Sequence, residues 1–186
     1  EVTQLFECSH SEALDKMHTW SQTPLPISAS SYHDSILRVR FSGAAKAVNT
    51  AIETLGGQTM LEDRQYWQSL KDQQLDFFTG GQATTKPLWR ISMASDIESL
   101  DLPADYANDD CLYEWGGALR WLKSDAPAEV MHSAASVVDG HASLFRHPQG
   151  SIFQPLTPGL LRIHKNLKQA FDPENILNPG KLYPEL

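Results

Sequence analysis

This 186-residue chain has few cysteines, few basic residues and no long apolar run. Cys8 and Cys111 form no C-x-x-C pair, so the sequence favours a reducing compartment over a disulfide scaffold, with a single bridge as the alternative. No stretch reaches the roughly eighteen consecutive apolar residues of a membrane span. Lysine and arginine total 15 against 23 acidic residues, and the net charge of −8 argues against nucleic acid or an anionic membrane surface as a partner.

The 11 glycines show none of the spacings that bind phosphate groups. No two are arranged as G-x-G, and there is no G-x-x-x-x-G-K-[ST] loop. The G-x-S-x-G and H-E-x-x-H motifs are also missing. His141 and His147 have no acidic neighbour at ligand spacing, so we expect no metal site. These motifs alone reveal no complete active site.

The composition is that of a folded globular protein, with 41% hydrophobic and 20% charged residues. The length suffices for one domain with a substantial core, or for two small lobes at most. The opening residues, 1–7, contain no initiator methionine and none of the basic or apolar segments of a signal peptide. We therefore expect a piece of a longer polypeptide or a processed product.

Hydrophobic periodicity and capping residues predict helices that alternate with strands. Helices are expected over 11–21, 43–55, 62–74, 128–137 and 158–171. Strands are expected near 2–6, 36–41, 88–93, 111–115, 118–122 and 143–146, with 28–31 as a serine-rich loop. Gly116 and Gly117 predict a hairpin, which requires an antiparallel pair. The predicted fold class is α+β and ferredoxin-like, with a mostly antiparallel sheet and helices packed on one face.

The segment 96–114 contains acidic residues but no lysine or arginine. This pattern predicts an exposed connection. The segment is either a solvated loop or a surface that docks a basic face of a partner subunit.

The most informative stretch is carboxy-terminal, at residues 167–183. Asp172 can cap a short helical turn that has Pro173 at its first position. Residues 178–181, Asn-Pro-Gly-Lys, fit a type II turn with proline second and glycine at the position that needs a positive φ. From the residues alone, a helix exit followed by a final edge strand is the simpler interpretation.

The run Phe-Asp-Pro-x-x-Ile-Leu-Asn-Pro-Gly-Lys, at 171–181, resembles the carboxy-terminal signature of FAD-linked oxidases of the vanillyl-alcohol oxidase type. Three further segments, at 88–92, 114–122 and 140–146, are similar to one branch of that family. This branch comprises the FAD-binding E subunits of bacterial glycolate oxidase, also called glycolate dehydrogenase. The resemblance extends over about residues 80–186, and residues 1–79 fit mainly by pattern.

The resemblance implies that residues 1–186 are the carboxy-terminal cap domain, without the amino-terminal domain that binds most of the FAD. The intact subunit would work with an FAD-binding catalytic subunit and an iron–sulfur subunit. Their complex would oxidise glycolate, a small 2-hydroxy acid, to glyoxylate. The resemblance implies a cytoplasmic location, or association with the inner face of the membrane through partners. The isolated fragment is expected to be inactive and to bind FAD weakly or not at all.

The resemblance also suggests site residues, although it assigns no catalytic one. Asn178, Pro179, Gly180 and Lys181 match the motif near the flavin and would bind the cofactor, with a purely structural turn as the alternative. Four further candidates would face the flavin or substrate: Arg90, His141, Arg120 and Arg146.

Each of these four also has a simpler interpretation. Arg90 could bind a carboxylate in a bidentate pair, or be solvated or paired with an acid. His141 could accept a proton or be structural. Arg120 could stack on the Trp115 indole, and Arg146 could form a surface pair.

A second hypothesis remains open for the whole chain. The fold could be a self-contained ferredoxin-like binding or interaction module with no redox role. An upstream FAD-binding domain of about 150–200 residues, a typical domain size, would distinguish the first hypothesis from the second.

Overall fold

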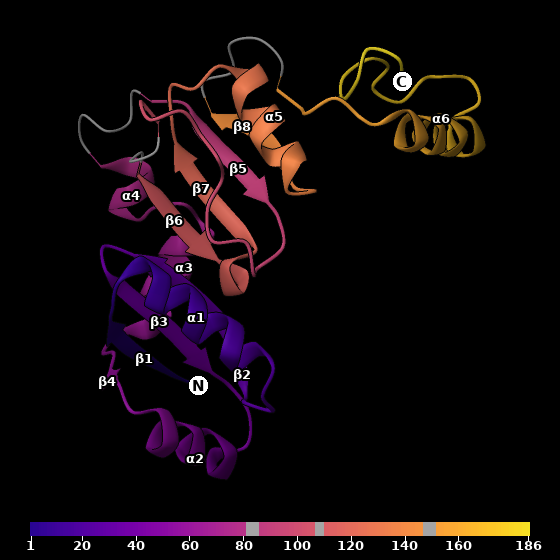
Figure 1. Cartoon of the computed structure of the whole chain (residues 1–186). Helices are drawn as coiled ribbons and strands as arrows, with labels where there is room; N and C mark the ends of the chain where they lie inside the picture. The colour runs from indigo at the N-terminus through magenta and orange to yellow at the C-terminus, as the bar shows by residue number, and fades with distance from the viewer. Residues whose placement is uncertain (81–85, 107–109, 147–151) are drawn as a thin grey trace.

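A computed structural model describes residues 1–80, 86–106, 110–146 and 152–186. Its centre is an eight-stranded antiparallel sheet in the order β4-β1-β3-β2-β6-β7-β5-β8 (Figure 1). The strands are β1 (Val2–Glu7), β2 (Ile27–His33), β3 (Ile36–Phe41), β4 (Gln58–Thr59), β5 (Leu88–Ser92), β6 (Cys111–Glu114), β7 (Leu119–Lys123) and β8 (His141–Arg146). The helices are α1 (His10–Ser21), α2 (Ala45–Leu55), α3 (Asp63–Lys71), α4 (Asp76–Thr79), α5 (Ala128–Val137) and α6 (Pro158–Phe171). A 3-10 turn, η2 (Trp115–Gly117), joins β6 to β7.

The α+β class and the antiparallel sheet predicted from the sequence are confirmed. The β6–β7 hairpin also forms as predicted, with Tyr113 opposite Arg120. The serine-rich stretch 28–31 was wrongly predicted as a loop, because it lies within β2. Its serines bond to other elements: Ser31 Oγ lies 2.7 Å from Tyr66 Oη, and Ser30 Oγ accepts a hydrogen bond from the Gly116 amide. Because these hydroxyls form hydrogen bonds, the polar segment can be buried within the sheet.

The helices cover both faces of the sheet rather than the single face predicted. On one face, α1 and α2 pack on β3 through residues such as Leu37 and Phe41, and α5 packs on β5 and β8. On the opposite face, α3 and α4 contribute Trp67, Leu70 and Phe77 to a separate cluster. Arg38 and Arg40 of β3 share this second face, as their alternation predicts, and they stack over the rings of Tyr66 and Trp67.

The predicted connection at 96–114 is only partly a loop. Its carboxyl-terminal part forms β6. The acidic side chains of 96–105 are exposed, whereas Ile97, Leu100 and Leu102 pack against the core beneath α5. The segment is therefore anchored by its apolar residues and presents its charges to solvent.

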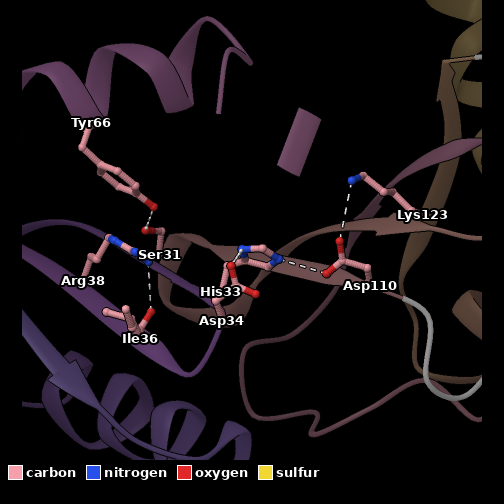
Figure 2. A network of polar contacts seen from close by, with 8 residues as sticks. All are labelled: Ser31, His33, Asp34, Ile36, Arg38, Tyr66, Asp110 and Lys123. Atoms are coloured by element: carbon pink, nitrogen blue, oxygen red, sulfur yellow. Dashed lines mark hydrogen bonds and ion pairs between the residues drawn. The ribbon is translucent and has the colours of Figure 1, made fainter. Parts of the chain in front are cut away.

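A seam divides the sheet between β2 and β6, where the described residues pair at Ser31–Glu114 and Tyr32–Tyr113. At one end of this seam, His33 Nε2 lies 2.9 Å from Asp110 Oδ1 (Figure 2). The buried Lys123 ammonium lies 3.6 Å from Asp110 Oδ2. The His33 hydrogen bond and these nearby charges hold the pKa of the Asp110 carboxyl below its usual range. Ionic contacts thus supplement the short strand pairing.

The carboxy-terminal segment extends away from the sheet (Figure 1). Helix α6 begins with a Thr157 cap and Pro158 at its first turn, and none of its residues is buried. Its apolar side chains Leu160, Ile163, Leu167 and Phe171 are 47–82% exposed. This apolar stripe has no covering partner among the residues that the structure describes.

Candidate functional site

The sheet face that carries α3 also brings together polar side chains from neighbouring strands. In antiparallel strands, directly paired residues point to the same face. Arg90 pairs with Trp121, and Ser92 pairs with both Leu119 and His141. Glu114 pairs with Leu119 on its other side. Arg90, Glu114 and His141 therefore occupy one face across four strands.

Arg90 is a half-buried cation on this face. Its guanidinium carbon lies 5.5 Å from the centre of the Trp115 ring. Across the described ranges, no residue accepts a hydrogen bond from Arg90 or pairs with it within ion-pair distance. Since a guanidinium offers five N–H donors, this side chain is available to bind a carboxylate.

The Trp115 side chain is an exposed aromatic ring that stacks on the Arg90 guanidinium. It is 63% exposed although it is large and apolar. Its backbone has a φ of 53°, in the left-handed region that is costly for residues with a Cβ. The exposed indole is therefore free to pack against an apolar or flat ligand.

Glu114 contributes a carboxylate beside Arg90. Its Oε1 accepts a 2.7 Å hydrogen bond from Trp121 Nε1. Burial raises the pKa of Glu114, and this effect outweighs the lowering by the Trp121 hydrogen bond and the Arg90 charge. The group is therefore easier to protonate than an exposed glutamate.

These residues line a groove of about 870 Å³ that opens at the seam. One wall comes from β2, β3 and the end of α1, and another comes from α3. Arg40 lies in the first wall, where its Nε donates to Ser28 Oγ at 2.9 Å. Four of the five tryptophans of the chain border this space: Trp20, Trp67, Trp115 and Trp121. A cavity of this size and lining is suited to an organic ligand.

His141 lies on the same face as Arg90, at the start of β8. Burial and the nearby Arg90 charge lower the pKa of His141. Its imidazole is therefore favoured in the neutral form, which can accept a proton. The structure thus brings two of the predicted candidates, Arg90 and His141, to one place.

Arg120 lies on the opposite face of the sheet and is only 3% exposed. Its guanidinium donates to the carbonyls of Gly117 at 3.2 Å and Glu98 at 3.1 Å, and also to that of Ile97. It stacks over Tyr113 rather than over Trp115. Since these groups occupy its donors, Arg120 anchors the 97–98 segment to the hairpin.

Arg146 is also engaged within the fold. It donates to the Phe78 carbonyl at 3.1 Å and to Gln73 Oε1 at 2.6 Å. These bonds tie β8 to α4 and to the turn before it. Neither Arg120 nor Arg146 lines the groove.

The carboxy-terminal motif forms two successive turns, both set by specific side chains. Asp172 accepts hydrogen bonds from the amides of Ile176 at 2.9 Å and Leu177 at 2.8 Å, and from Lys168 Nζ at 2.5 Å. The Lys168 bond is the first cause that lowers the pKa of Asp172 from 3.8 to about 2. The ionised Asp172 carboxylate therefore holds the turn at 172–177 against the end of α6.

The second turn presents the predicted cofactor-binding residues. Gly180 has a φ of 68°, and the Lys181 amide donates to the Asn178 carbonyl at 3.2 Å, as in a type II turn. Asn178, Pro179, Gly180 and Lys181 are all exposed. A Cβ at Gly180 would meet no atom within 4 Å, so the space beside its Cα is open, and the Gly180 amide donates to the Leu186 carbonyl at 2.5 Å.

Sequence reasoning missed Glu114, Trp115 and Arg40 as parts of this site. Glu114 could have been found from strand alternation, because Leu112 two residues earlier is fully buried and shares its face. Arg40 could not have been placed, since its position depends on the distant seam.

The structure also bears on metal binding and on membrane insertion. No group of three or more His, Cys, Asp and Glu side chains suited to a metal ion occurs in residues 1–80, 86–106, 110–146 and 152–186. His147 lies outside these ranges. None of the helices within them is long and apolar enough to cross a membrane.

Comparisons with known proteins agree with the resemblance seen in the carboxy-terminal motif. Residues 152–182 match the family "FAD linked oxidases, C-terminal domain". Over 180 residues, or 97% of its length, the chain is 42% identical to the glycolate oxidase subunit GlcE of Escherichia coli (strain K12). The chain spans only 48% of that relative. No solved structure matched significantly.

Proposed function

We propose that this chain, whose residues 152–182 match the FAD linked oxidase C-terminal domain, is the carboxy-terminal part of an FAD-binding subunit that serves glycolate oxidation. In this proposal, a complex oxidises glycolate to glyoxylate and passes the electrons through FAD to an iron–sulfur subunit. An FAD-binding catalytic subunit would complete the complex. The observation that carries the proposal is the 42% identity to GlcE over nearly the whole chain.

The residues of the groove face suit a small organic acid held beside the flavin. Trp115 offers a flat exposed ring, and Arg90 offers a guanidinium without an acceptor. The sequence lacks a glycine-rich phosphate loop, so the diphosphate would be bound by other parts of the protein. FAD, when bound, would accept the two electrons that leave the hydroxy acid.

The chain's own residues would bind and orient in this scheme. Arg90 would bind the substrate carboxylate, and His141 in its neutral form would accept a proton. Residues 178–181 would approach the cofactor on the side of Gly180 where a Cβ would meet no atom. Arg120 and Arg146 would act only by maintaining the fold.

The exposed face of α6 supports a division of the intact subunit into two parts. Water-exposed apolar stripes on helices usually bind another part of the protein. An amino-terminal FAD-binding domain would provide that partner, since the relative is about twice as long as this chain.

The test is FAD binding by the 186-residue chain and by the full-length subunit, measured by equilibrium dialysis. We expect the full-length subunit to retain FAD and the shorter chain to bind it weakly or not at all. Absence of FAD binding by the full-length subunit, alone and with its partners, would contradict the proposal. It would leave the binding module as the better hypothesis.

A further inference from the structure

The groove pairs a cation with a hydrogen-bond acceptor on one face of the sheet. Arg90 has no acceptor for its donors among the residues described, and it stacks on Trp115. Glu114 Oε1 accepts the hydrogen bond from Trp121, and no donor among the described residues bonds to its second oxygen. An anion at Arg90 and a hydroxyl at Glu114 would each find a free partner.

The same groove provides apolar surface far beyond the needs of glycolate. Trp115, Leu119 and Trp121 line it on the side of Arg90, and Trp67 and Leu70 line the side of α3. At about 870 Å³ it lies in the upper range for small-molecule sites. The smallest 2-hydroxy acid would leave most of this surface in contact with water.

We propose that the groove is a binding site for 2-hydroxy acids with a large apolar substituent. The carboxylate binds Arg90, the hydroxyl donates to Glu114, and the substituent packs against Trp115 and Trp121. This inference rests on the proposed function for the choice of a hydroxy acid, and it extends the substrate class of that site.

Charge and geometry favour this ligand over a simple carboxylic acid. A carboxylate alone would bind Arg90 but would leave the Glu114 carboxylate facing a second negative charge. A hydroxyl beside the carboxylate places a donor toward Glu114, and this hydrogen bond offsets part of the repulsion. Because burial raises the pKa of Glu114, this carboxylate is protonated, and the repulsion relieved, at a higher pH than for an exposed glutamate.

The experiment is a titration of the 186-residue chain with phenyllactate, followed by tryptophan fluorescence. This signal is suitable because four of the five tryptophans border the groove. We expect saturable quenching, with a dissociation constant about tenfold or more below that of glycolate, from burial of the phenyl group. 3-Phenylpropanoate, which lacks the hydroxyl, and phenyllactamide, which lacks the charge, should both bind more weakly.

Two variants and one control test the proposed contacts of phenyllactate with Arg90 and Glu114. Arg90→Gln should weaken phenyllactate binding about tenfold or more, since it removes a charge-assisted bond. Glu114→Gln keeps an acceptor for Trp121 and should reduce the preference for phenyllactate over 3-phenylpropanoate. Arg162→Gln, on the exposed side of α6, should leave the titration unchanged.

Absence of saturable quenching, or equal affinity in Arg90→Gln and the unmodified chain, would overturn the proposal. Should Arg90→Gln fail to fold, the comparison of phenyllactate with phenyllactamide on the unmodified chain decides in its place. The readout needs neither FAD nor turnover. A full-length subunit with flavin but without this binding would refute the inference alone, and binding without any flavin would refute the proposed function alone.

Discussion

Three arginines of the chain show how one residue type takes different roles through its surroundings. Arg120 and Arg146 donate to carbonyl and amide oxygens of the fold, whereas Arg90 contacts an exposed indole and no acceptor among the residues described. A guanidinium that donates to groups of the fold stabilises structure, and one without such acceptors is available to a ligand. The sequence named these three arginines together with His141 as candidates, because the face of Arg120 follows from the sheet register and the partners of Arg146 come from distant parts of the chain.

Replacing Arg120 by lysine should destabilise the chain. An ammonium cannot reach three carbonyl groups in the planar arrangement of a guanidinium, so buried acceptors would lose their donors. We expect the free energy of unfolding to fall by about 2 kcal/mol in urea denaturation. Arg162→Lys on exposed α6 should change it little, and equal effects of the two variants would contradict this role for Arg120.

Asp172 should titrate with a midpoint of about 2, against an ordinary value of 3.8. Because the pKa of Asp172 is lowered in the folded state, its ionised carboxylate stabilises the fold. This contribution to the free energy of unfolding is present above about pH 3.8 and is lost as the pH falls toward 2. Lys168→Met removes the first cause of this shift and should raise the midpoint. Carboxyl NMR titration measures both values, and an ordinary midpoint in the unmodified chain would refute this role of the ionised Asp172 carboxylate.

Among the elements, the turn between β6 and β7 determines where Trp115 and Glu114 point. Trp115, Gly116 and Gly117 all have positive φ, and the Gly116 amide is anchored to Ser30 across the seam. This geometry needs the two glycines that predicted the hairpin. The sequence indicated the turn correctly, although it could not show that an exposed tryptophan would lie over Arg90.

Gly117→Ala and Gly116→Ala should separate backbone strain from steric conflict. Both have positive φ, but a Cβ at Gly117 would lie 3.0 Å from Leu14 Cδ2, whereas one at Gly116 meets nothing within 4 Å. We expect Gly116→Ala to lower the free energy of unfolding by about 1 kcal/mol and Gly117→Ala by about 2–3 kcal/mol. Urea denaturation provides the comparison, and a larger effect at Gly116 would contradict the packing of α1 on η2.

The elements predicted best were those with a clear apolar period. The α2 and α6 helices and the β3 and β5 strands show such a pattern in the sequence, and the structure contains them near their expected bounds. β2 was missed because its serines are buried by hydrogen bonds to Tyr66 and to the Gly116 amide, which no local pattern reveals. Likewise, the second helical layer depends on α3 crossing beneath β3, a long-range contact.

At the scale of the whole molecule, the sheet and α6 differ in how they are stabilised. The sheet has apolar clusters on both faces, and α6 exposes its apolar stripe. The seam adds a further division within the sheet, and the groove opens there. An additional domain that covers α6 would complete the molecule without disturbing the groove.

Adding charge to the apolar stripe of α6 tests whether another domain covers this helix. The double variant Leu160→Glu and Ile163→Glu should leave the unfolding temperature of the 186-residue chain nearly unchanged, because both side chains are about half exposed. In the full-length subunit the same change should lower it by several degrees through loss of an apolar interface. Gln169→Glu on the opposite side of α6 is the control. An unchanged full-length subunit would refute a covering domain.

The role in glycolate oxidation is tested by the absorbance spectrum of the full-length subunit, purified alone and with its proposed partners, before and after addition of glycolate. We expect a flavin spectrum that glycolate bleaches when the partners are present. A subunit without flavin in every preparation, or a flavin that glycolate never bleaches in the assembled complex, would contradict it.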